Sequence, residues 1–580
     1  MRSELLAVKA LNQYRRRDVL AYLGLRYYLE SQCARSDLWS EDVATHLVST
    51  RSAPIYFRCY HFKEMDRDGS VIHRNLYLPG PNEILAESAL LHKCSLDPAF
   101  KPLSCVYSYL FPKPNSKEGI FRSYFPGFRK RHESIARICN ESDKSIVQYT
   151  DIKRFYPTIS KELARKVWLS VCDSSSISSM YRDLGERLLV NQNETAMTHN
   201  DGLGVLTGPM FTHLIANLIL GKVDQVMFGR MGERYSRYVD DIALVGDATQ
   251  VDEGRELLKS LLEDMGFSLH EEGKDFRVDS TEWLEGTRDF DDSGSKAWVS
   301  LIANIKRFLI TKPEERTILA HVFSENGINI PLLDYSSAVS ESSYVEKLSD
   351  WIARYTWAPK IMRTLTVEKL LEDAIEARKT YQNKIERLLA KGTDVQGYKR
   401  KRLIPKLRFY AGRLTFLASS DVLSSLSLAL VNYPELLLQS SVMSTVQSRD
   451  VSSLLKLGAN AVQAAAQVLQ IQNDPVRCSL SSIGEVELQG IAALRLNGVD
   501  IDFMNDAVSN ATVSDPLNQF ALGYKTLELM KSDNLFVREI ACLRGIENPL
   551  RHKTILNTAF DRDEQLVLDI INRLRDSSSF

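Results

Sequence analysis

The spacing of hydrophobic residues changes character along the chain. Up to about residue 310, short apolar runs of strand type alternate with helical ones. Residues 311–413 and 414–580 instead repeat apolar positions every three or four residues, as amphipathic helices do. Breaks rich in Asn, Asp, Gly and Pro, at 473–475 and 514–516 for example, separate the helices of the last third. We therefore expect a mixed α+β part followed by helix pairs stacked as in a solenoid, although no clean sequence period marks a repeat.

Two predicted strands of the α+β part end in carboxylates. An apolar run ends at Asp151 and is followed by a turn and a helix that Ser160 is suited to cap. The run 235–247 places Asp240 and Asp241 at a tight turn between two antiparallel strands, which projects both carboxylates from one end of a sheet. Asp is also a common turn residue, and this is the alternative interpretation of the pair. If the two strands are neighbours, Asp151 and Asp240 meet at one edge of the sheet.

Facing carboxylates repel each other unless a positive charge lies between them. A pair of Mg²⁺ ions, or Mn²⁺ in their place, is the natural neutralising group, because carboxylate and phosphate oxygens are the ligands these ions prefer. Two such ions can hold the attacking and the leaving oxygen of a phosphoryl transfer. The two strand ends therefore indicate a site for that chemistry.

A glycine-rich loop lies between the two acidic segments. Gly204 and Gly208 would let the backbone approach a ligand closely. A helix that begins near Pro209 would turn its N-terminal amides toward the site. The alternative interpretation is a packing loop followed by a core helix.

Three basic residues are suited to phosphate groups. Lys113 and Arg122 flank a hairpin-like turn, where they would grip a triphosphate as a point charge and as a planar fork. Lys274 follows a predicted helix that ends at Gly266 and a short predicted strand, and it would neutralise or protonate a leaving pyrophosphate. The alternatives are an exposed charged hairpin and a solvated lysine.

Composition limits the class of protein. The chain has 580 residues, of which 44% are apolar and 25% charged, so we expect a soluble globular protein of two or three domains. No apolar run is long enough for a membrane span, and the N-terminus lacks the pattern of a signal peptide. The eight cysteines include no Cys-x-x-Cys pair and the ten histidines show no ligand spacing, which favours buried thiols over disulfides or a zinc site. We expect a cytoplasmic protein without membrane contact.

The net charge of −1 hides a strong polarity. Residues 376–413 hold twelve Lys and Arg against three acids, a net +9, whereas 414–580 hold thirteen bases against nineteen acids, a net −6. The basic segment has two interpretations. It could follow nucleic-acid phosphates with aromatic residues as stacking partners, or it could be a solvated or acid-paired helical face docked on the acidic tail. The stacking candidates are Tyr381, Tyr398, Phe409 and Tyr410.

The order of these segments resembles the fingers and palm of reverse transcriptases, over about residues 70–310. The matching motifs are Lys113 with Arg122, Asp151 with Tyr156, Gly204 and Gly208 with Ala216 and Asn217, Tyr238-Val239-Asp240-Asp241, and Gly266 with Lys274. The resemblance implies an α+β right-hand polymerase followed by an all-helical, repeat-like C-terminal domain. Its parts would be an N-terminal helical extension (1–69), fingers and palm (70–310), a helical thumb with the basic segment (311–413) and the helical domain (414–580).

The resemblance also implies roles for single residues. The metal site would comprise Asp151, Ile152, Asp240 and Asp241, and Lys274 falls on the proposed general acid. The nucleotide site would comprise Lys113, Arg122, Ile152, Phe155, Tyr156, Gly208, Pro209 and Tyr238. The bulky ring of Tyr156 would collide with a ribose 2′-hydroxyl, so dNTPs should be preferred and an RNA polymerase is disfavoured.

A reverse transcriptase palm with a long acidic helical tail is similar to the bacterial abortive-infection and defence-associated reverse transcriptases. This implies an antiphage enzyme that forms homo-oligomers and makes DNA, in several members without a conventional template and primed from a protein hydroxyl, so that the product is covalently attached. Candidate priming residues are Tyr14, Tyr22, Tyr27 and Tyr28. Two alternatives stay open: a template-copying enzyme of retron or intron type that copies a partner RNA, and a non-catalytic scaffold assembled through its helical tail. A non-coding RNA template and a second protein are the possible partners.

Overall fold

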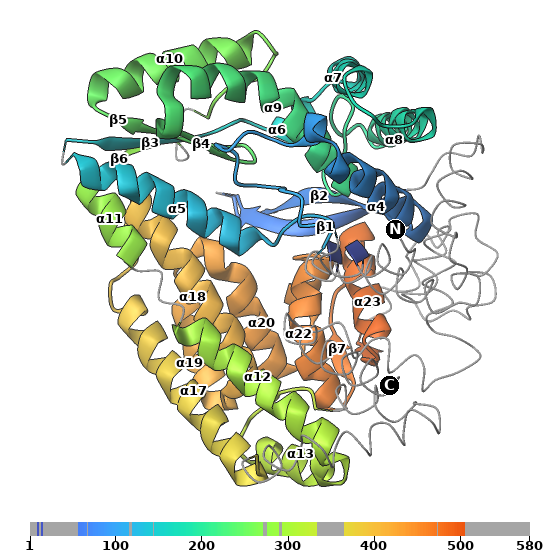
Figure 1. Cartoon of the computed structure of the whole chain (residues 1–580). Coiled ribbons are helices and arrows are strands. Elements are labelled where there is room, and N and C mark those ends of the chain that lie inside the picture. Colours follow the sequence, from blue (N-terminus) through green and yellow to red (C-terminus); the bar gives the residue numbers. More distant parts are fainter. Residues whose placement is uncertain are drawn as a thin grey trace, which may run out of the picture. The chain divides into compact units, whose positions relative to one another are not determined.

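The chain folds as an α+β protein, and this part of the predicted fold class is confirmed. The computed structural model describes residues 9–10, 13–14, 56–66, 68–114, 119–142, 144–270, 275–288, 293–332, 365–472 and 474–504 (Figure 1). The chain separates into two compact units. Of the described residues, the first unit holds those of Met1–Arg58 and Asn75–Phe290, and the second those of Cys59–Arg74 and Asp291–Asp533. None of the helices in these ranges is long and apolar enough to cross a bilayer.

The first unit is built on an antiparallel four-stranded sheet in the order β4-β5-β3-β6. Its strands are β3 (Ile146–Asp151), β4 (Tyr235–Tyr238), β5 (Asp241–Gly246) and β6 (Phe276–Asp279). Helices α9 (Met210–Met231) and α10 (Ala248–Glu263) lie over one face, and α5 (Tyr124–Glu141) and α11 (Ser280–Arg288) over the other (Figure 1). Because both faces are covered, β3 and β5 are buried along nearly their whole length, and β5 reads as a continuous apolar run from Ile242 to Val245. Strand β3 also buries the polar residues Gln148 and Thr150.

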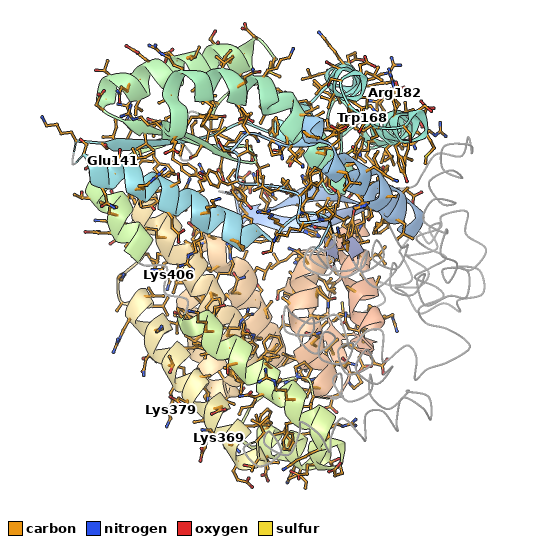
Figure 2. All side chains as sticks on the ribbon, in the orientation of Figure 1. Glu141, Trp168, Arg182, Lys369, Lys379 and Lys406 are labelled. Carbon is orange, nitrogen blue, oxygen red and sulfur yellow. The ribbon has the colours of Figure 1, made fainter. Side chains whose placement is uncertain are left out.

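Local sequence explains where the flanking helices begin. Asp247 starts α10 with a capping box, since its side chain accepts from the Gln250 amide at 2.9 Å while the Gln250 side chain accepts from the Asp247 amide. Ser160 caps α7 (Lys161–Asp173) through the Leu163 amide, as predicted. Figure 2 shows Trp168 between α7 and α8 (Ser179–Thr198). A Cβ atom at Gly185 would approach this indole to 2.3 Å, so only glycine lets the two helices pack so closely.

The N-terminal part differs from the predicted helical extension. Residues Tyr56–Met65 form strand β1, which pairs with β2 (Val71–Pro79) as a two-stranded sheet before helix α4 (Pro81–Leu96). The run is rich in aromatic residues, which favour strands over helices. Apart from short helical pieces at residues 9–10 and 13–14, the rest of the expected extension lies outside the described residues.

The second unit consists mainly of helices that pack in successive pairs, α17 with α18, α19 with α20 and α22 with α23. This arrangement agrees with the predicted stacking of helix pairs. Two short parallel strands contradict the all-helical prediction for residues 414–580. The elements are α12 (Ser293–Thr311), α13 (Arg316–Glu325), α17 (Val367–Leu389), α18 (Gly397–Leu417), α19 (Ser420–Leu430), α20 (Leu437–Ser448), α21 (Ser452–Leu455), α22 (Ala459–Ile471), β7 (Val476–Cys478), α23 (Glu485–Leu496) and β8 (Ile501–Phe503).

The basic segment forms α17 and α18, and its aromatic residues are placed for packing. Tyr381, Tyr398 and Tyr410 are all less than 10% exposed, so their rings cannot stack on nucleic-acid bases, and the interpretation that required this is wrong for these three. Arg400 instead forms a bidentate ion pair with Glu435 of the acidic tail, at 2.6 and 2.9 Å. Lys379 points away from α17 in Figure 2 and is exposed. The acid-paired helical face is therefore the better description of this segment.

Buried thiols are confirmed for the six described cysteines. Each of them is a free, buried cysteine: Cys59, Cys94, Cys105, Cys139, Cys172 and Cys478. Burial raises the pKa of the Cys105 thiol to about 12 and that of Cys139 to about 11, so both stay protonated and unreactive near neutral pH.

Candidate active site

Three acidic residues lie at one end of the four-stranded sheet. In the antiparallel pairing of β3 with β5, Asp151 lies directly opposite Asp241, and Tyr238 of β4 lies opposite Asp241 on its other side. Asp240 occupies the turn between β4 and β5, and its carbonyl accepts a hydrogen bond from the Ile152 amide at 3.2 Å. The two strands are therefore neighbours, as predicted, and the residue directly opposite Asp151 is Asp241.

The surroundings of the three carboxylates differ. Asp151 is buried, at 4% exposure, whereas Asp240 and Asp241 are half-exposed. The Nε2 atom of His270 lies 3.8 Å from Oδ2 of Asp151, and the His270 amide donates to the Asp151 carbonyl at 2.9 Å. The sequence interpretation gave His270 no role, because a lone histidine after a short apolar stretch carries no recognisable pattern.

The oxygen ligands at these strand ends suit a hard divalent cation. They fit a cation that also takes ligands from a substrate better than one held by protein side chains alone. Carboxylate oxygens on neighbouring strand ends are the ligands Mg²⁺ prefers, and Mg²⁺ commonly takes one or two protein carboxylates together with substrate phosphates and water. Among the described ranges, no three His, Cys, Asp or Glu side chains come close enough to hold a metal ion by themselves. The residues therefore fit Mg²⁺ that arrives with a phosphate-bearing substrate.

The turn that carries Asp240 is strained and tightly held. Val239 has φ +59°, a conformation that costs a non-glycine residue about 1–2 kcal/mol and is especially unfavourable for a β-branched one. The Val239 amide donates to Oγ of Ser108 at 2.7 Å, and the Val239 carbonyl accepts from the Arg237 guanidinium at 2.9 Å. Both backbone polar groups of the strained residue are thus bound, which pins the turn in place.

Arg237 connects the turn to the core of the unit. Its guanidinium is 1% exposed and pairs with the equally buried Asp224 of α9 at 2.6 and 2.8 Å, while a third contact reaches Asn217 Oδ1 at 3.1 Å. Burial works to lower the pKa of Arg237, but Asp224 with its hydrogen bonds, helped by Tyr235 and Cys105, raises it above its ordinary value. The sequence interpretation missed this pair, although an arginine in the middle of a buried strand needs a buried acid as its partner.

The segment after Asp151 holds the residues predicted to contact the nucleotide. Ile152 and Phe155 are at most 2% exposed, so their side chains belong to the core, and Phe155 packs against Phe267 with ring centroids 5.3 Å apart. Arg154, at φ +48°, turns the chain into the short helix α6 (Phe155–Thr158). Tyr156 is half-buried, and its hydroxyl lies 2.6 Å from Nδ1 of His213 in α9.

The glycine loop is fixed by a close contact with β2. Gly208 has φ +133°, and a Cβ atom there would lie 2.3 Å from the Tyr77 carbonyl, so no other residue fits. Pro209 immediately precedes α9, as predicted. The expectation that the first amides of α9 face the site is wrong, because the amides of Met210 and Phe211 donate to Oε2 of Glu87, a buried residue of α4.

Lys113 and Arg122 are both exposed, on the two sides of a turn whose tip, residues 115–118, lies outside the described residues. The two sides pair through the Arg122 amide and the Leu110 carbonyl at 2.8 Å. Tyr238 is buried, and its ring packs at right angles on that of Tyr124, which is 61% exposed. Lys274 lies outside the described residues.

No protein-family model matches the chain, and no curated protein shows significant sequence similarity to it.

Proposed function

We propose that this chain is a DNA polymerase of reverse-transcriptase type that joins dNTPs by nucleotidyl transfer. The observation that carries the proposal is the register of β3 against β5, which puts Asp151 opposite Asp241 beside the strained turn at Asp240. The order of the five motifs and the small antiparallel sheet covered by helices on both faces support the palm of a right-hand polymerase. Backbone strain next to convergent carboxylates is itself typical of functional sites.

In this proposal the metal ligands are Asp151, Asp240, Asp241 and the backbone carbonyl of Ile152. When bound there, Mg²⁺ supplies charge neutralisation for the phosphates. Lys113 and Arg122 hold the triphosphate, the ring of Tyr156 excludes a ribose 2′-hydroxyl, and Lys274 donates a proton to the leaving pyrophosphate. Phosphoryl transfer asks mainly for positioning, which explains why the turn at Val239 is bound at both of its backbone polar groups.

The test is nucleotide incorporation by the purified full-length chain with Mg²⁺ or Mn²⁺. Labelled dNTPs are supplied alone in one arm and with a primed RNA template in the other. We expect Asp151→Asn and Asp240→Asn to lower incorporation by roughly a thousandfold or more, because each removes a carboxylate ligand of the Mg²⁺ that neutralises the reacting phosphates. The matched control is Asp279→Asn, since Asp279 is exposed and pairs with Ile146 at the opposite end of β3.

Two results would contradict the proposal. One is a folded wild-type chain that incorporates no nucleotide in either arm, which favours the scaffold interpretation. The other is an Asp240→Asn variant that keeps the wild-type rate. Synthesis in the templated arm alone identifies the template-copying type, and product that stays with the protein after denaturation identifies priming from a side chain. Tyr14 is a poor priming candidate because it is 1% exposed, and the other three tyrosines lie outside the described residues.

The resemblance to abortive-infection and defence-associated enzymes supports a role for this polymerase in antiphage defence. Phage plating on bacteria that carry the wild-type gene or the Asp240→Asn variant tests that role. We expect reduced plating only with the wild-type gene. Equal plating on both strains would contradict the defence role and leave the polymerase proposal standing.

A further inference from the structure

His213 lies where three parts of the first unit come together. It is 3% exposed on α9, and its ring is stacked on Tyr109, with centroids 3.9 Å apart and an interplanar angle of 6°. Its Nδ1 atom lies 2.6 Å from the Tyr156 hydroxyl, and the two rings meet at 82°. One buried imidazole therefore contacts both the segment that leads to Lys113 and the residue proposed to select the sugar.

The stack on Tyr109 fixes one side of the imidazole. Tyr109 adopts φ +49°, an uncommon conformation for a non-glycine residue, and its ring also packs at right angles on Phe121. The next residue, Leu110, pairs with the Arg122 amide. The imidazole is thus held by the base of the turn that carries Lys113 and Arg122.

The hydrogen bond fixes the far end of the Tyr156 side chain. A tyrosine ring has two rotatable bonds, so packing near its Cβ atom alone leaves the ring free to tilt, whereas an anchor at the hydroxyl stops that motion. A ring that selects the sugar by collision works only as far as it cannot move aside, because a displaced ring leaves room for a ribose hydroxyl. Selection against one extra hydroxyl therefore depends on how rigidly the ring is held.

We propose that His213 is a positioning residue that holds the ring of Tyr156 in place and thereby sets the preference for deoxyribonucleotides over ribonucleotides. The inference rests on the proposed polymerase function and deepens it. His213 itself has no contact with substrate in this role and acts only through the Tyr156 hydroxyl.

The test compares kcat/KM for a dNTP with kcat/KM for the matching rNTP. His213→Leu keeps the volume but removes the imidazole partner of the hydrogen bond, and Tyr156→Phe keeps the ring but removes the hydroxyl partner. We expect each to lower the dNTP-to-rNTP ratio by up to about tenfold, the value of one hydrogen bond. Because both changes remove the same bond, the double variant should lose no more than either single variant.

Rescue separates positioning from packing. His213→Asn retains a side-chain amide that can accept or donate a hydrogen bond near the position of Nδ1, and it should restore the ratio to within about twofold, although it loses the stack on Tyr109. The control is His132→Leu, because His132 is also buried and stacked, on Trp283 at 4.5 Å, but lies away from Tyr156 on α5. It should leave the ratio unchanged.

An unchanged ratio in Tyr156→Phe and His213→Leu would overturn the inference while the polymerase function stands. A lowered ratio in His213→Leu that His213→Asn does not restore would assign His213 to packing and would also overturn it. If His213→Leu fails to fold, Tyr156→Phe and His213→Asn still decide. A wild-type chain that makes no polymer refutes the proposed function itself, and this outcome is distinct because no ratio can be measured.

Discussion

The Arg237–Asp224 pair of the first unit and the Arg400–Glu435 pair of the second have the same chemistry in different settings. Both partners of the first pair are 1% exposed, and Arg237 also holds Asn217 and the strained Val239. The second pair is 24% and 40% exposed, and Arg400 also donates to the carbonyls of Thr393 and Val395 in the loop before α18. The first pair positions a turn that bears a carboxylate, whereas the second joins a helix to its neighbour.

The two units also differ in where their strained backbone conformations lie. Among the described residues, the non-glycine positions with positive φ are Tyr109, Arg154, Asn200, Val239 and Arg449. Three of them, Tyr109, Arg154 and Val239, lie next to candidate site residues of the first unit. Arg449 is the one in the second unit, and its conformation is explained by its place at the C-terminal cap of α20. Asn200 of the first unit directly follows the C-terminal cap of α8, so a positive φ accompanies a helix end in both units. Among the described residues, strain beside candidate site residues is found in the first unit alone.

The largest difference between the two units, in free energy of unfolding, should appear when the acid of each ion pair is replaced by its neutral amide. Asp224→Asn leaves a buried guanidinium without its counter-charge and should lower the free energy of unfolding of the first unit by about 3–5 kcal/mol. Glu435→Gln should cost the second unit only about 0.2–1 kcal/mol. Hydrogen exchange read peptide by peptide measures both, and we expect faster exchange over β4 and β5 in Asp224→Asn. Similar losses in the two variants would contradict the distinction between the pairs.

Two buried carboxylates of α4 should make the stability of the first unit depend on pH. Burial raises the pKa of Glu87 to about 8 and that of Glu83 to about 7, although two amides of α9 donate to Glu87. A raised pKa means that the folded state holds its proton while the unfolded state has lost it. The stability of the first unit should therefore fall as pH rises from about 4.5 to 8.

Glu87→Gln removes this proton linkage and keeps an acceptor for the α9 amides. Relative to the wild type, the variant should be more stable at pH 8 than at pH 5, with a change on the order of 3 kcal/mol between the two pH values. Urea unfolding at both values measures it. Glu83→Gln should act in the same direction over a lower pH range, from about 4.5 to 7. A difference from the wild type that is the same at pH 5 and pH 8 would refute the assignment.

The smallest effect is expected on the basic helices of the second unit. Lys399 and Lys401 are exposed, so replacing both with Ala should change the free energy of unfolding by less than about 0.5 kcal/mol. Because the neighbouring aromatic rings are buried, we also expect affinity for short single-stranded DNA to change by less than about twofold across a salt series. A clear drop in affinity with a shallower salt dependence would restore the nucleic-acid role of this segment and break the contrast between the units.

The sequence by itself determined the elements that depend on neighbouring residues. The strand that ends at Asp151, the turn before Asp241, the Ser160 cap and the helix after Pro209 were all predictable, because apolar periodicity and capping act within a few residues. Local signals also misled at β1 and at the short strands β7 and β8, where the pattern of an isolated stretch does not reveal its pairing partner.

Only the tertiary structure decided which distant groups complete the site. Glu87 caps α9 from 123 residues away, and His213 meets Tyr156 across 57 residues. Neither contact can be recognised from the local sequence. There Glu87 is a single acid on a predicted helix, and His213 is a single histidine among apolar residues. Burial then forces each polar group to find a partner, because an unmet hydrogen bond in the core costs more than the bond itself contributes. The sequence thus determined the carboxylate-bearing strand ends, and long-range packing decided how they are held.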